Sequence, residues 1–99
     1  MGCPSIYYKQ ALQYFARSLG YARDSELGEE LFEEQSEEKL EKFILQEKEQ
    51  TEEKFFYYDA GMASRLVLYD AEKEGCDAFN AAIGGLIEFE YFIGLLDGR

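Results

Sequence analysis

Residues 5–22 read SIYYKQALQYFARSLGYA, and their apolar side chains recur at intervals of three and four residues. This spacing places them along one face of an α-helix. Pro4 is tolerated in a first helical turn and Gly20 is typical of a helix end, so the sequence predicts a helix between them. The side chains that we expect to face the core are those of Tyr8, Ala11, Leu12, Phe15, Ala16 and Leu19.

Three more segments of the chain show signs of helix. The pair Asp24 and Ser25 can cap a short helix, Ser36 can cap the next one, and Asp77 can cap the last. The predicted apolar stripes are Leu27, Leu31 and Phe32 in the first segment, Leu40, Phe43 and Ile44 in the second, and Ala82, Ile83, Leu86, Phe89, Ile93 and Leu96 in the third.

Residues 55–70 allow two interpretations. One is helical, because an apolar series continues here at spacings of three, four, four and three. This interpretation allows two arrangements. Either one long helix runs from the Ser36 cap and is broken near Gly61, or two shorter helices form. The other interpretation is a hairpin, because residues 55–59 and 65–70 are rich in aromatic and branched side chains around an Ala-Gly turn. The helical series consists of Phe55, Tyr58, Met62, Leu66 and Tyr69.

The helical interpretation is favoured, and it gives a fold class. We expect one domain over residues 1–99 that is all-α, a small bundle of four or five helices. An α+β fold with a hairpin at about 55–70 is the alternative. The 99 residues, 46% of them hydrophobic, are enough to bury one modest core but not two.

Negative charge is concentrated in one part of the chain. The net charge is −11 at pH 7, and residues 24–53 hold 13 of the 21 acidic residues but three of the ten basic ones. Nucleic acids and anionic membranes are bound by clustered lysine and arginine, so this balance argues against direct binding of either. The natural partner of such a segment is a basic protein surface.

The sequence offers little to catalysis or to a cofactor. It has no histidine, the commonest acid–base residue near neutral pH and the commonest nitrogen ligand for metals. Asp70, Glu72 and Glu74 match the start of a calcium-binding EF-hand loop, but Ala81 stands where the bidentate glutamate is required. We therefore expect no enzyme, no cofactor, no metal site and no deep pocket lined by two carboxyl groups.

Cysteine use and hydropathy bear on location. Cys3 and Cys76 form no CxxC motif, no leader-like segment opens the sequence, and no run approaches 18 uncharged apolar residues. The expectation is a cytoplasmic protein without a membrane span.

The leading functional hypothesis is a protein-binding inhibitor or regulator that uses its acidic helices. Carboxylates at helical spacing present a row of negative charge similar to a phosphate backbone, which suits the basic groove of a nucleic-acid-binding protein. Small phage and plasmid proteins that mimic nucleic acid, including some anti-restriction and anti-CRISPR proteins, are similar in size and charge. A solvated face without a partner is the competing interpretation. The predicted partner-binding residues are Glu26, Glu29, Glu30, Glu33, Glu34, Glu37, Glu38 and Glu41.

A second hypothesis rests on aromatic residues. Residues 55–58 are four consecutive aromatic residues, and four consecutive positions point around most of a helix. Some of them must therefore face outward, where tyrosine and phenylalanine serve as interface anchors. The chain would then be a helical oligomer or adaptor that associates through its C-terminal helix. A thick core with tyrosine hydroxyls reaching water is the alternative explanation. The predicted second interface comprises Tyr57, Tyr58, Phe89, Tyr91 and Phe92.

Overall fold

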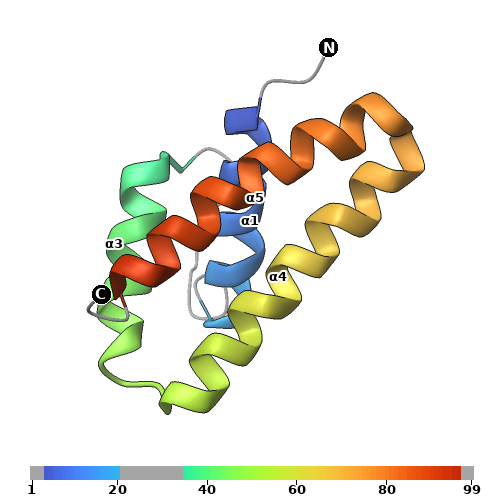
Figure 1. Ribbon diagram of the computed structural model, residues 1–99. Coiled ribbons are helices and arrows are strands. Elements are labelled where there is room, and N and C mark those ends of the chain that lie inside the picture. Colours follow the sequence, from blue (N-terminus) through green and yellow to red (C-terminus); the bar gives the residue numbers. More distant parts are fainter. Residues whose placement is uncertain (1–3, 21–34, 97–99) are drawn as a thin grey trace.

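The computed structural model describes residues 4–20 and 35–96, which form four helices and, within these ranges, no strand (Figure 1). The helices are α1 (Pro4–Ser18), α3 (Glu37–Lys48), α4 (Glu53–Glu74) and α5 (Cys76–Leu96). The predicted all-α helical bundle is confirmed. The alternative hairpin at residues 55–70 is wrong, because α4 runs through the whole segment. The short helix predicted around Leu27, Leu31 and Phe32 lies outside the described residues.

Local signals place most of the helix ends. The Ser36 side chain accepts a hydrogen bond from the Lys39 amide at 3.3 Å, which satisfies one of the free amides at the start of α3. Gly20, with φ of 104°, follows the end of α1 in the left-handed region that favours glycine. The prediction that Asp77 caps the last helix is wrong by two residues, because the carbonyl of Gly75 accepts the first hydrogen bond of that helix, from the Phe79 amide. That helix starts at Cys76, and Asp77 lies in its first turn, where its charge suits the helix dipole.

The stripe that contains Leu40 and the apolar series at residues 55–70 belong to separate helices. The chain leaves the helix between Lys48 and Glu53, and α4 then continues for 22 residues without a break at Gly61. A glycine in a helix interior costs only about 1 kcal/mol relative to alanine, so it does not by itself end a helix.

Helix α1 is the centre of the bundle and contacts each of the other described helices. In Figure 1, α5 crosses in front of α1, while α4 runs beside α5 and joins it at Gly75. The ring of Phe15 on α1 connects three helices. Its centroid lies 4.9 Å from that of Phe56 on α4 and 5.9 Å from that of Phe89 on α5, both edge to face.

The predicted inward faces are confirmed for α1 and α3. Along α1 the predicted stripe is buried except for Leu19, which is half-buried, and along α3 Leu40 and Ile44 are buried. The prediction for α5 fails at Ile83, which is 41% exposed, whereas Leu86 and Phe89 are in the core.

The predicted inward face of α4 is wrong. Phe55, Tyr58, Leu66 and Tyr69 are exposed, and Met62 is half-buried. Helix α4 instead packs through a face of small residues, which let its backbone approach α1 and α5 closely. Phe56 at one end of this face fills the space between the helices. The buried residues of α4 are Phe56, Ala60, Ala63, Val67 and Ala71.

Candidate functional site

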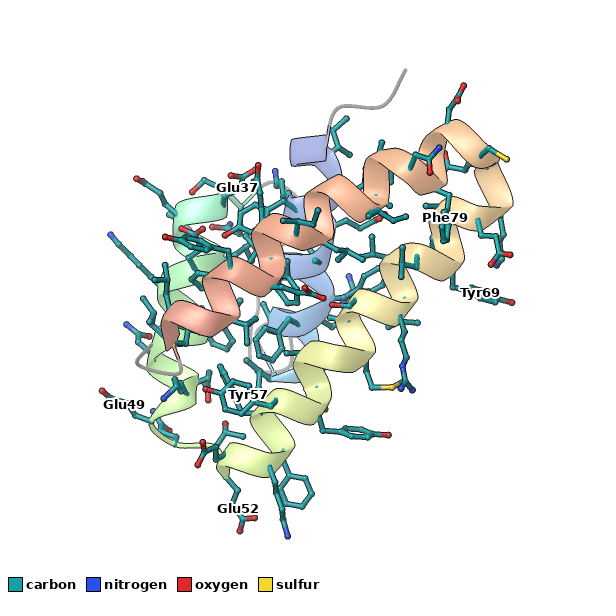
Figure 2. The ribbon with its side chains drawn as sticks, in the orientation of Figure 1. Glu37, Glu49, Glu52, Tyr57, Tyr69 and Phe79 are labelled. Carbon is teal, nitrogen blue, oxygen red and sulfur yellow. The ribbon has the colours of Figure 1, made fainter. Side chains whose placement is uncertain are left out.

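Three of the eight glutamates predicted to bind a partner belong to the described residues. Glu37 and Glu38 form the first turn of α3, where negative charge is stabilised by the helix dipole, and Glu41 follows one turn later. The other five, Glu26, Glu29, Glu30, Glu33 and Glu34, lie outside the described residues. In Figure 2, Glu37 and Glu49 mark opposite ends of α3, so carboxylates of this segment lie at both ends of the helix.

Glu41 is tied to the core by a hydrogen bond. The hydroxyl of Tyr8, on α1, donates to Oε2 of Glu41, on α3. The pKa of Tyr8 is raised from its usual value, first because its side chain is buried and then because of this hydrogen bond. The negative charges of Glu41, Glu37 and Glu88 raise it further. Negative charge from α3 and α5 therefore acts on one tyrosine hydroxyl of α1.

A groove of about 630 Å³ opens at this point, and we name it the α5 groove. Most of its wall comes from α5, and one residue each comes from α1 and α3. It brings two carboxylates together, which the sequence did not lead us to expect, although the groove is open to solvent and not deep. Its lining residues are Tyr8, Glu41, Ile87, Glu88, Tyr91, Phe92 and Leu95.

The apolar part of the α5 groove belongs to a longer exposed line on α5. Ile83, Ile87, Tyr91 and Leu95 follow one another at intervals of four residues and are 41%, 63%, 70% and 53% exposed. Residues four apart lie one above another on a helix surface, so these side chains form a continuous strip. Contiguous exposed apolar surface is a mark of an interaction site.

By length and composition, α5 is the one helix among residues 4–20 and 35–96 that could cross a membrane. It carries three acidic residues, and it contributes Leu86 and Phe89 to the bundle core. The absence of a membrane span remains a prediction.

The five aromatic residues of the predicted second interface do not share one surface. Phe89 is in the core at 1% exposure, and Tyr57 and Phe92 are half-buried and pack against the core. Figure 2 shows Tyr57 directed from α4 toward the interior of the bundle. Tyr58 and Tyr91 are exposed, but they belong to different helices. The alternative explanation, a thick core, therefore accounts for three of the five.

The residues that match the start of an EF-hand loop belong to a helix. Asp70, Glu72 and Glu74 lie within α4, so they cannot form a calcium-binding loop, and Asp70 accepts a hydrogen bond from the Tyr14 hydroxyl. No cluster of three metal-ligating side chains occurs in the described part of the chain. Cys76 is exposed at the turn between α4 and α5, beside a hollow of about 360 Å³ that Phe79 also lines (Figure 2).

No protein-family model, no curated protein and no solved structure matches this chain.

Proposed function

We propose that the chain is a non-catalytic regulator that binds a basic segment of another protein in the α5 groove. One observation carries the proposal: the carboxylates of Glu41 and Glu88 line the groove together with Tyr8, at the edge of an exposed apolar strip. A groove of this kind complements a ligand that is apolar on one side and positively charged beside it.

The geometry of the strip fits an amphipathic helix. Ile87, Tyr91 and Leu95 span eight residues of α5, which is about 12 Å at the rise of an α-helix. A bound helix offers anchors at a similar spacing, at positions i, i+3 or i+4, and i+7. Tyr91 is 70% exposed, and tyrosine is among the residues that most often dominate binding energy.

The overall charge of the chain supports the same class of partner. A net charge of −11 attracts a cationic segment over long range at low ionic strength and accelerates the encounter. Lysine or arginine beside the apolar anchors of the ligand would then meet Glu37, Glu41 or Glu88.

Mimicry of nucleic acid is a narrower form of this proposal. It needs a row of carboxylates along one face, and Glu37, Glu38 and Glu41 of α3 are its described members. A binder of this kind would be displaced from its partner by DNA or RNA. Reversal of Glu33, Glu34, Glu37 and Glu38 to lysine would abolish such binding.

The second candidate function is a helical adaptor that associates through α5, and the exposed strip from Ile83 to Leu95 favours it. Apolar association changes little with ionic strength, whereas binding through carboxylates weakens steeply as salt is added. The salt dependence of partner binding therefore separates the two candidates.

The test uses a fluorescent peptide of leucine and lysine, designed as a helix with one apolar and one basic side. Fluorescence anisotropy should report saturable binding at low salt. Tyr91→Ser and Glu88→Lys should each raise the Kd by about tenfold, since each removes a main contact of the groove.

Matched controls exist for both variants and for the peptide. Tyr69→Ser removes another exposed tyrosine, which lies on α4, and Glu90→Lys reverses a neighbouring exposed carboxylate that does not line the α5 groove. Both should leave the Kd within about twofold of the wild type. A scrambled peptide of the same composition controls for general attraction to an acidic protein. Equal effects of Tyr91→Ser and Tyr69→Ser would count against the α5 groove.

A further inference from the structure

Helix α4 has an exposed apolar stripe on the side opposite its core face. Phe55, Tyr58, Leu66 and Tyr69 are 53%, 65%, 42% and 60% exposed, and Met62 is half-buried between them. We call these five residues the α4 outer stripe. Figure 2 shows Tyr69 pointing away from the bundle. The stripe shares no residue with the α5 groove, so it requires a separate explanation.

The α4 outer stripe is symmetric about its central residue. Tyr58 and Leu66 each lie four residues from Met62, and Phe55 and Tyr69 each lie seven residues away. Four and seven residues are close to whole helical turns, so all five side chains share one face. If a second α4 is laid antiparallel across Met62, Phe55 meets Tyr69, Tyr58 meets Leu66, and Met62 meets its own copy.

Charged residues lie at both ends of the stripe. Nζ of Lys54 lies 5.1 Å from the ring centroid of Phe55, and Nζ of Lys73 lies 4.3 Å from that of Tyr69. Lys54 and Glu72 are 18 residues apart, which is five full turns, so they lie on the same flank of α4. In the antiparallel arrangement Lys54 of one chain and Glu72 of the other lie on the same flank of the interface. They are two residues out of level, about 3 Å along the helix axis, which their long side chains can span, and this pairing occurs twice.

We propose that two copies of this chain form a dimer through the outer stripes of their α4 helices, antiparallel about Met62. A twofold interface needs a surface that is complementary to itself. The stripe meets this requirement in its apolar order and in the charges of Lys54 and Glu72. A different protein as partner would give no reason for symmetry about Met62. The dimer leaves the α5 groove free, and it is independent of the function proposed above.

Disulfide trapping tests the position of the axis. Met62→Cys is introduced into a chain that carries Cys3→Ser and Cys76→Ser, so that the new thiol is its only cysteine. Under mild oxidation it should give a covalent dimer, because the two facing positions fall within the distance a disulfide requires.

Gly61→Cys in the same background is the matched control. A side chain at this position meets no atom within 4 Å, so the variant tolerates the change, and its thiol points about 100° away from Met62 around the helix. It should remain largely monomeric. Equal yields of covalent dimer from the two variants would overturn the proposed axis.

Charge exchange tests the pairing by sedimentation equilibrium. Lys54→Glu should weaken the dimer by about tenfold, since it places a glutamate beside Glu72 of the other chain at both ends of the interface. Adding Glu72→Lys should restore the dimer, because the pair is then reversed and not removed. Adding Glu74→Lys instead restores the net charge without restoring the pairing. This double variant should dimerise as weakly as Lys54→Glu alone. A wild-type chain that is monomeric up to about 100 μM would overturn the proposal.

Discussion

Two adjacent phenylalanines in α4 have opposite environments. Phe56 is fully buried and packs edge to face on Phe15, whereas Phe55 is 53% exposed. Phe56→Ala should lower the free energy of unfolding by about 3–5 kcal/mol, through lost burial and the cavity left behind. Phe55→Ala should change it by no more than about 0.5 kcal/mol. Urea unfolding at concentrations where the chain is monomeric checks both values. Similar losses in the two variants would contradict the described register of α4.

Two tyrosines predict the response to alkaline pH. Burial and the bond to Glu41 raise the pKa of Tyr8, and the bond to Asp70, with burial, raises that of Tyr14. An unfolded tyrosine ionises at about pH 10. Because the folded state holds the proton more tightly, this stabilisation is complete below pH 10 and decreases as the pH rises above it.

Removal of the Tyr8 hydroxyl isolates this effect. Tyr8→Phe should lose less free energy of unfolding between pH 8 and about pH 11 than the wild type, since phenylalanine has no proton to lose. Tyr58→Phe, which alters an exposed hydroxyl on α4, should keep the wild-type pH dependence. Urea denaturation at both pH values gives the comparison. Identical pH dependence in all three proteins would contradict the raised pKa of Tyr8 in the folded state.

At the scale of the helix, two glycines should respond oppositely to alanine. Gly75, between α4 and α5, has φ of 119° and ψ of 179°, a conformation that side chains disfavour strongly. Gly61 is exposed within α4, and an added Cβ there meets no atom within 4 Å. Gly75→Ala should destabilise the fold by about 1–3 kcal/mol, and Gly61→Ala should stabilise it by up to about 1 kcal/mol. Thermal unfolding followed by circular dichroism measures both changes, and a stabilised Gly75→Ala variant would contradict the described turn.

How far the sequence predicts each helix depends on how many apolar faces the helix has. Helix α1 has one such face, so its spacing and burial agree, and the cap at Ser36 places the start of α3 correctly. Helix α4 has two apolar stripes, one of large residues from Phe55 to Tyr69 and one of mainly small residues from Phe56 to Ala71. The stripe of large residues was the wrong one, because close helix packing selects small residues. The distance between packed helices cannot be read from a single sequence.

The site was less predictable than the fold. The acidic segment indicated the sign of the charge, but the α5 groove combines Tyr8, Glu41 and Glu88 from three helices far apart in the sequence. Its position depends on how α1, α3 and α5 pack together, which periodicity within each helix does not specify. The exposure of Ile83 was missed for a similar reason, because α5 is apolar around much of its circumference.

For the molecule as a whole, salt should act in opposite directions on the two proposed interactions. Peptide binding in the α5 groove should weaken between about 10 and 150 mM salt, because the Debye length falls from about 30 to 8 Å. The dimer should strengthen over the same range, because each chain carries a net charge of −11 and exposed ion pairs add little. Anisotropy and sedimentation at both salt concentrations measure the two constants. A dimer that weakens with added salt would indicate that its ion pairs outweigh the repulsion between the chains.

The central position of α1 has a consequence for synthesis on the ribosome. Helix α1 is made early, yet it packs extensively on α5, which begins at Cys76, about 58 residues after α1 ends at Ser18. At about 5–20 residues per second, roughly 3–12 s pass before α5 begins to be made. During that interval Leu12 and Phe15 face a core that is not yet complete, so the nascent chain exposes apolar surface that is prone to aggregate, and completion of the core has to wait until α5 is translated.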